Sequence, residues 1–191
     1  MTGEVARYWL GLGANLGDRA EALAGVAIRL AAAGVQIEAS SRLFETAPRE
    51  IEDQPSFLNG AVRVASEVSP RAMLALVKRI ERELGRTEGR RYGPRVADCD
   101  LLLWSRGVWR DEALEIPHPR LAERRFALVP LLDIDPELAL PDGRRITDLA
   151  AKIDAAEQPV VPIPISQAGP WTGELAALIL KSGAISPTMK A

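Results

Sequence analysis

The chain has 191 residues, a formal net charge of −2, 47% hydrophobic residues and 26% charged residues. This is ordinary globular composition, and the length suits one domain with a full core. The slightly acidic balance argues against broad nucleic-acid binding, and no apolar run approaches the roughly 18 residues that span a bilayer. A single cysteine and a single histidine exclude an internal disulfide and disfavour a His/Cys zinc site.

The same features set expectations about location and partners. Residues Met1 to Leu10 lack a basic region followed by a long apolar one, which is the pattern of a secretory signal. Together with the lone cysteine, this predicts a cytoplasmic protein. We expect a monomer that binds small molecules, with no membrane or nucleic-acid partner.

The first hundred residues alternate strand and helix patterns. Buried or alternating apolar runs predict strands at Ala6–Leu12, Val35–Phe44 and Phe57–Ser66. One-sided apolar patterns predict helices at Asp18–Ala33 and from Pro70 to Leu84, the first ended by Gly34 and the second by Gly85.

The glycines of the turn Gly13–Arg19 allow two interpretations. A glycine-rich turn between strand and helix can hold a phosphate. No Gly-Lys-Ser/Thr follows, so the turn is not a P-loop. A tight turn that ends at a helix cap, Asp18, is the favoured interpretation.

The second half begins with a predicted strand at Asp98–Trp104 and a short hairpin segment at Val108–Arg110. Leu114–Pro119 is expected to be extended because prolines restrict the residues before them. Helices are predicted at Arg120–Asp133, started or kinked by Pro130, and at Ile146–Ile153.

Two strand–helix–strand units in succession predict a ferredoxin-like α+β fold. In this arrangement an antiparallel sheet carries packed helices, giving three αβα layers. We expect residues 1–154 to form this domain. Residues 155–191 are proline-rich and are expected to be an appended, partly mobile extension, with a small amphipathic helix at Gly173–Lys181.

The stretch from Arg86 to Trp104 carries the clearest chemical pattern. A loop with four arginines precedes a strand that begins with Asp98 and Asp100. Residues two apart on a strand project to the same face, so the two carboxylates lie side by side. Hard divalent cations prefer such oxygen ligands together with substrate phosphates, and arginines suit polyphosphate. A metal–nucleotide site is therefore predicted, and the alternative is a solvated arginine loop beside an ordinary acid pair.

At this point the residues resemble a known family. The run Arg91–Asp100 (RYGPRVADCD) resembles the signature of the 6-hydroxymethyl-7,8-dihydropterin pyrophosphokinases of folate biosynthesis. Further pieces occur in the family's order, and six in order are more specific than one. They are Leu12–Asp18 (LGANLGD), Thr46–Pro48 (TAP), Asp53–Asn59 (DQPSFLN), Ile116–Pro119 (IPHP), Arg124–Phe126 (RRF) and Pro141–Gly143 (PDG).

The resemblance implies transfer of pyrophosphate from ATP to the pterin hydroxymethyl group, leaving AMP. Asp98 and Asp100 match the family carboxylates that bind two Mg²⁺ ions, which neutralise charge developing on the transferred phosphates. Arg86 and Arg95 match arginines near those phosphates, and with the two aspartates they are the expected catalytic residues. The positions matched to ATP binding are Lys78, Glu81, Arg86, Tyr92, Arg95, Leu101, His118 and Arg124.

On the pterin side, Phe57 and Phe126 match an aromatic pair that stacks on both faces of the ring. Asn59 matches an amide that donates to and accepts from the ring edge, and Thr46 lies beside it. Pro48 and Asp98 complete the expected pterin-binding set.

The chain also departs from the family pattern. Cys99 replaces an aliphatic residue, and Lys78 replaces an uncharged polar one. The loop Gly85–Gly93, expected to act as a lid, is one residue shorter than in some relatives and carries Glu88 where an arginine is expected. Two other hypotheses stay open: a phosphotransferase with another acceptor substrate, or a binding module without catalysis on the same fold.

Overall fold

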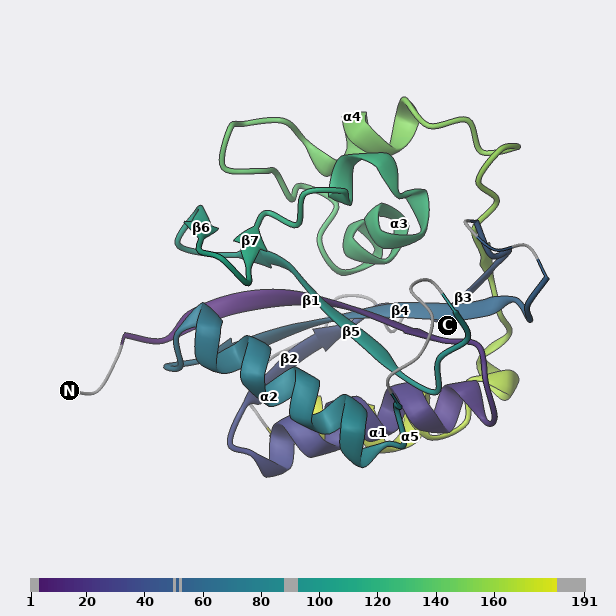
Figure 1. Ribbon diagram of the computed structural model, residues 1–191, viewed down its shortest axis with the longest axis horizontal. Helices are drawn as coiled ribbons and strands as arrows, with labels where there is room; N and C mark the ends of the chain where they lie inside the picture. The colour runs from purple at the N-terminus through teal and green to yellow at the C-terminus, as the bar shows by residue number, and fades with distance from the viewer. Residues whose placement is uncertain (1–3, 50, 52, 88–92, 182–191) are drawn as a thin grey trace.

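The computed structural model describes residues 4–49, 51, 53–87 and 93–181 of the chain. At its centre lies a six-stranded antiparallel sheet in the order β5-β1-β4-β3-β8, with β2 also paired to β4 (Figure 1). Its strands are β1 (Ala6–Ala14), β2 (Gln36–Ser40), β3 (Phe44–Thr46), β4 (Phe57–Ser66), β5 (Asp98–Trp104) and β8 (Val161–Pro162).

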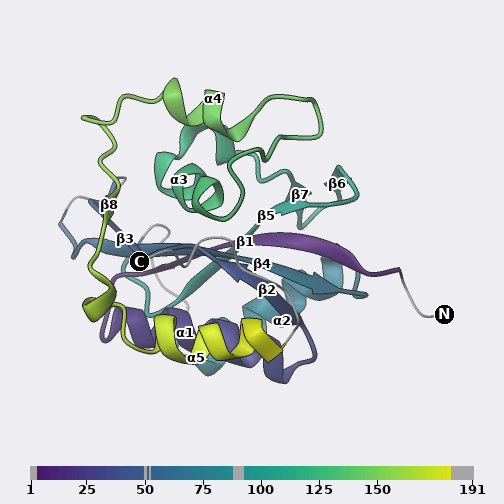
Figure 2. The same cartoon turned by 180° about the vertical axis from the view of Figure 1, so that it is seen from behind.

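Helices cover both faces of this sheet. One face carries α1 (Arg19–Ala32), α2 (Pro70–Glu83) and α5 (Pro170–Lys181). The other carries α3 (Arg125–Ile134) and α4 (Ile146–Ala151), seen above the sheet in Figures 1 and 2. The predicted three-layer α+β fold is confirmed. The remaining elements are the two-stranded sheet of β6 (Trp109–Arg110) and β7 (Glu115–Ile116), and the 3₁₀ turns η1 (Leu121–Glu123) and η2 (Ile165–Gln167).

Side-chain caps are present at the predicted starts of α1 and α2. Asp18 accepts a hydrogen bond from the Glu21 amide at 3.0 Å, and Ser69 accepts one from the Ala72 amide at 3.3 Å. Each cap satisfies a backbone donor that the first helical turn leaves free. The turn before α1 therefore ends in a helix cap, as the favoured interpretation of Gly13–Arg19 stated.

Two predicted elements are divided in the structure. The strand expected over 35–44 is two strands, β2 and β3, because Ser41 bonds to Ala61 of β4 through both its amide and its hydroxyl. The helix expected over 120–133 is split at Arg124, whose extended backbone (φ −119°, ψ 94°) separates η1 from α3. Pro130 lies inside α3.

The segment after residue 154 packs on the fold as far as it is described. Strand β8 pairs with β3 at the sheet edge. In the helix that follows, Trp171 is 2% exposed and its indole N–H donates to the Ser41 carbonyl at 2.8 Å. The division into a domain and an extension at residue 154 stays a prediction. No helix among the described residues is long and apolar enough to cross a membrane.

Candidate active site

A pocket opens on the face of the sheet that carries α3. Its floor is β1, the strand between β5 and β4, where Gly11 and Gly13 contribute no side chains. A Cβ atom at Gly13 would lie 3.2 Å from Oδ1 of Asn59, and one at Gly11 would lie 2.9 Å from Leu102. Glycine at these positions therefore leaves room above the strand.

Strand register sets the two ends of the pocket. Gly13 pairs with Asp98 of β5 on one side and with Asn59 of β4 on the other. Neighbouring strands lie about 4.8 Å apart, so the acidic and amide side chains stand on either side of an open strip roughly 10 Å wide. The pocket thus has an acidic half over β5 and an apolar half over β4.

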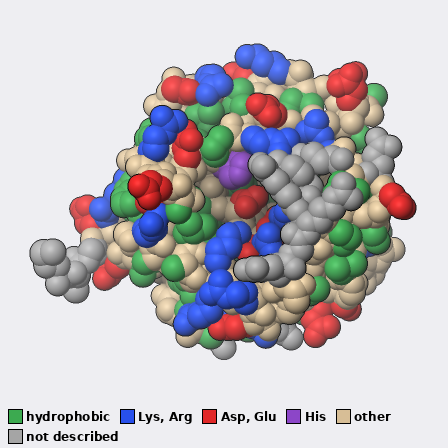
Figure 3. Space-filling view, in the orientation of Figure 1, with side chains coloured by type: hydrophobic (Ala, Val, Ile, Leu, Met, Phe, Trp, Pro, Cys, Tyr) green, Lys and Arg blue, Asp and Glu red, His purple; other side chains and the backbone are tan. Residues whose placement is uncertain are grey.

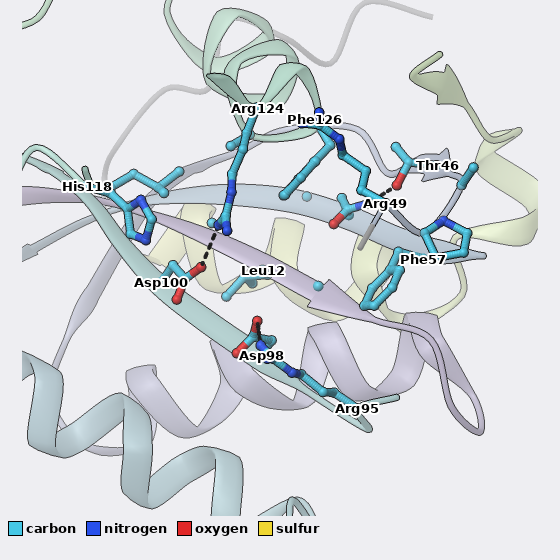
Figure 4. Close-up of a pocket in the computed structure, with 18 of the residues that line it drawn as sticks. Leu12, Thr46, Arg49, Phe57, Arg95, Asp98, Asp100, His118, Arg124 and Phe126 are labelled. Atoms are coloured by element: carbon cyan, nitrogen blue, oxygen red, sulfur yellow. Dashed lines mark hydrogen bonds and ion pairs between the residues drawn. The ribbon is translucent and has the colours of Figure 1, made fainter. Parts of the chain in front are cut away.

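Asp98 and Asp100 project together into the acidic half, as the strand pattern predicted (Figure 4). Cys99 between them is fully buried on the opposite face. In that apolar position burial raises the pKa of its thiol well above the ordinary value. The cysteine is therefore a packing residue, and the two carboxylates are the groups presented to the pocket.

Two arginines hold Asp98. Arg86 lies 2.5 Å from Oδ1, and Arg95 contacts Oδ2. Burial alone would raise the pKa of Asp98, but the charges of Arg95 and Arg86 outweigh it, so the pKa is lowered. Asp98 is therefore ionised at neutral pH.

Asp100 is held less closely by positive charge than Asp98 is. Burial and the charge of Asp98 raise its pKa, although Arg124 reaches to 3.9 Å and His118 lies beside it (Figure 4). Desolvation lowers the pKa of His118, and its Nδ1 accepts a hydrogen bond from the Arg120 amide. The ring is therefore neutral near pH 7, with its proton on Nε2. In the surface view, the histidine borders a hollow that has acidic side chains within it and basic ones around it (Figure 3).

The apolar half is built from three separate elements. Phe57 comes from β4, Phe126 from α3, and Thr46 with Pro48 from the segment at the end of β3. Asn59 is 5% exposed, and its amide N–H donates to the Thr46 hydroxyl at 2.8 Å. This bond fixes the amide so that its oxygen faces Gly13 and the pocket. All five residues were predicted as a pterin site and line one pocket.

Some predicted residues lie behind the pocket wall. Glu81 is 2% exposed and accepts from Lys78 at 2.7 Å, from Arg86 at 2.6 Å and from the Cys99 amide at 2.8 Å. Lys78 also donates to the Cys99 carbonyl at 3.2 Å, so this network holds β5 between the two aspartates. The Leu101 side chain is buried in the core. Tyr92 and most of the arginine loop, 88–92, lie outside the described residues.

Two residues important to the pocket were not predicted. Arg49 lines it, and its guanidinium donates to the Glu123 carbonyl at 3.1 Å. Asn15 is 2% exposed and accepts from the Arg95 amide at 2.7 Å while donating to Gln54 at 3.1 Å. It thereby joins the arginine loop to the 51–56 segment. The sequence signal for this role was the asparagine inside the Leu12–Asp18 piece, whose burial only the structure shows.

The donor set of the acidic half suits a hard divalent cation. Two neighbouring carboxylates repel each other, and a cation between them would relieve the cost that raises the pKa of Asp100. Each oxygen of Asp98 meets one guanidinium and keeps a second lone pair. Among the described residues no group of three or more His, Cys, Asp or Glu side chains is placed to hold a metal. Substrate oxygens and water would complete the coordination.

Taken together, the fold and the pocket indicate a group-transfer enzyme, because acidic and basic side chains stand beside two aromatic rings that suit a flat substrate. The model of the 7,8-dihydro-6-hydroxymethylpterin-pyrophosphokinase family matches residues 9–136. The chain belongs to this family. It is accordingly a pyrophosphokinase, which transfers pyrophosphate to the hydroxymethyl group of hydroxymethyldihydropterin in folate biosynthesis.

Similar proteins support this membership. The 2-amino-4-hydroxy-6-hydroxymethyldihydropteridine pyrophosphokinase of Methylorubrum extorquens is 42% identical over 151 residues, which are 78% of this chain and 95% of that protein. The enzyme of the same name from Bacillus subtilis is 44% identical over 127 residues, 66% of this chain and 76% of that protein. A crystal structure of Plasmodium falciparum HPPK-DHPS with pteroate matches with a TM-score of 0.63 at 18% identity, over 80% of this chain and 43% of that one. At this identity it supports the fold alone.

Proposed function

We propose that the transfer takes place in this pocket, with ATP phosphates over the acidic half and the pterin in the apolar half. The observation that carries the proposal is the register of β1. Gly13 lies between Asp98 on one neighbouring strand and Asn59 on the other, so the two substrates meet above the glycines of β1. A shared pocket brings the attacking hydroxyl close to the phosphate and lowers the entropic part of the barrier.

In this proposal Asp98 and Asp100 hold two Mg²⁺ ions. Bound magnesium would supply positive charge to the phosphate oxygens as negative charge develops there. Arg86 and Arg95 form ion pairs with Asp98, so phosphates bound next to that carboxylate would lie close to both guanidinium groups. Their planar guanidinium groups can each bind two phosphate oxygens. Arg124 and His118 border Asp100 and supply further donors to the nucleotide.

The heterocycle is held by stacking and by its edge. Phe57 on the sheet and Phe126 on α3 approach the pocket from different layers, which suits the two faces of a flat ring. The Asn59 oxygen, oriented by Thr46, accepts from the ring edge. Lys78 and Glu81 also act indirectly, because they hold the Cys99 backbone and thus the spacing of the two aspartates.

The test is AMP formation from ATP by the purified chain with Mg²⁺ and 6-hydroxymethyl-7,8-dihydropterin, followed by anion-exchange chromatography. We expect AMP and the pterin diphosphate in equal amounts. A dihydropterin that lacks the hydroxymethyl group is the matched control and should give no AMP. Chelation of divalent ions should stop the reaction, and excess Mg²⁺ should restore it.

The two other hypotheses give different outcomes in this assay. ATP binding without any AMP would identify a binding module. AMP formation with another acceptor alcohol, and none with the pterin, would identify a different phosphotransferase.

We also propose that the enzyme is a cytoplasmic monomer that acts without a nucleic-acid or membrane partner. The acidic net charge and the single cysteine support this. A light-scattering mass of one chain, about 20.7 kDa, is the expected result. A mass of two chains would contradict it.

A further inference from the structure

Residues 154–169, here called the strap, connect the two outer layers of the molecule. The strap leaves α4, passes the edge of the sheet where β8 pairs with β3, and reaches α5 on the other face (Figures 1 and 2). It lies beyond residues 9–136, the part that the family model matches. The family model therefore assigns no role to the contacts of the strap.

One strap residue contacts the start of α3 in three ways. The Gln158 side-chain oxygen accepts from the Arg125 amide at 3.0 Å, and its side-chain NH₂ donates to the Glu123 carbonyl at 3.2 Å. Its backbone carbonyl accepts from the Arg125 guanidinium at 3.2 Å. Helix α3 has no side-chain cap from its own N-cap residue, Arg124. Gln158 therefore supplies from a distance the acceptor that a helix start requires.

The residues on either side of this cap line the active-site pocket. Arg124 reaches toward Asp100, and Phe126 forms part of the apolar half (Figure 4). The Glu123 carbonyl that Gln158 contacts also accepts from Arg49, on the pterin side of the pocket. One backbone turn, 123–126, thus receives the strap on its outer side and presents pocket residues on its inner side.

The strap is itself well anchored. The Gln158 amide donates to the Asp154 carbonyl at 3.0 Å, and the Ile163 amide donates to the Leu43 carbonyl at 3.0 Å. Ala168 and Trp171 are buried at the end of the strap and the start of α5. Residues 157–160 also border a second hollow, whose other walls include Phe126 and the 46–49 segment. A fixed strap therefore gives the turn at 123–126 a fixed position.

We propose that Gln158 is a positioning residue for the pterin half of the active site. Through the cap on α3 it fixes the place and angle of Phe126 above the sheet, and through Glu123 it supports Arg49. This inference rests on the proposed placement of the pterin against Phe126. It extends the active-site support to a segment outside the family-matched region.

The experiment compares Gln158→Ala, Gln158→Glu and the wild type by steady-state kinetics with the pterin and with ATP. Loss of the cap should raise KM for the pterin about threefold to tenfold, because a typical hydrogen bond contributes that factor. The change in kcat and in KM for ATP should be less than about twofold. The glutamate variant keeps the acceptor for the Arg125 amide and should restore most of the affinity for the pterin.

Gln167→Ala is the matched control, because Gln167 is an exposed glutamine of the same strap. It should leave all kinetic constants unchanged. A purely structural role for Gln158 would lower the melting temperature of Gln158→Ala while leaving KM for the pterin at the wild-type value, and that outcome overturns the inference. If the wild type itself makes no AMP from ATP and the pterin, it is the proposed function that fails.

Discussion

The two halves of the pocket are built in different ways. Most of the acidic half comes from one short stretch, in which Arg86 and Arg95 hold Asp98 and the next outward residue is Asp100, with His118 and Arg124 added from beyond it. The apolar half is assembled from β4, α3 and the segment after β3, and the start of α3 is capped from the C-terminal strap. The acidic half therefore depends mainly on charge within a local segment, and the apolar half depends on tertiary packing that holds distant segments in place.

This difference predicts that substitutions in the acidic half act on the rate and those in the apolar half act on affinity for the pterin. Charge aimed at the reacting phosphates acts mainly in the transition state, whereas stacking acts on the bound ground state as well.

The largest effect is expected for Asp98→Asn. The substitution removes a negative charge that both arginines and the proposed metal ions require, so kcat should fall by about a thousandfold or more. The measurement is AMP formation at saturating ATP and pterin. Asp148→Asn, at an exposed position on α4, is the control and should turn over normally. Turnover near the wild-type rate in Asp98→Asn would remove the metal assignment.

A smaller effect, on affinity, is expected for Phe126→Ala. Loss of the ring should raise KM for the pterin by about tenfold to a hundredfold, because both stacking and apolar contact are lost. Phe126→Leu keeps apolar bulk without a flat face and should lie between the two. Binding of the pterin, followed by quenching of tryptophan fluorescence, provides an independent dissociation constant. Equal affinity for the pterin in the wild type, Phe126→Ala and Phe126→Leu would mean that the pterin ring does not stack on Phe126.

A test of the strip between the halves comes from Gly13→Ala. The new methyl group would lie 3.2 Å from Oδ1 of Asn59 and would have to displace it. Crowding of this kind costs about 1 kcal/mol, so KM for the pterin should rise roughly fivefold. Gly25→Ala introduces a similar contact, 3.1 Å from Leu84, away from the pocket. It should leave KM unchanged, and an equal rise in both variants would attribute the effect to general loss of packing.

The sequence predicted the features that depend on neighbouring residues and missed those that depend on contacts between distant segments. Asp98 and Asp100 could be placed together from the two-residue period of a strand, and the cap at Asp18 from its position before a helical pattern. The break between β2 and β3 could not, because it depends on Ser41 bonding to Ala61, a residue distant in the chain. The contacts of Arg49 and Gln158 with residue 123 join segments 74 and 35 positions apart. Hydrophobic periodicity carries no information about such pairs.

The resemblance to the family supplied what periodicity could not for Phe57 and Phe126, which the structure brings to one pocket. It could not supply Gln158, because the matched residues end before the strap. It also gave Lys78 and Glu81 a nucleotide-side role, whereas in the structure they bond to each other and to the Cys99 backbone. Their predicted contact with ATP stays a prediction.

The smallest expected effect is on the stability of the fold, where substitutions of the two aspartates should act in opposite directions. The arginines lower the pKa of Asp98, so its carboxylate stabilises the fold above the unfolded-state pKa, and this contribution is lost as pH falls through the lower folded value. Burial and the Asp98 charge raise the pKa of Asp100, so its contribution is most favourable at low pH and is lost as pH rises through the raised folded value.

At pH 7, Asp98→Asn should therefore lower the melting temperature by a few degrees, and Asp100→Asn should raise it, although both lose activity. Calorimetry on the metal-free proteins measures both shifts. A lower melting temperature in Asp100→Asn would mean that Arg124 and His118 more than offset the repulsion, so that the second aspartate stabilises the fold as the first one does.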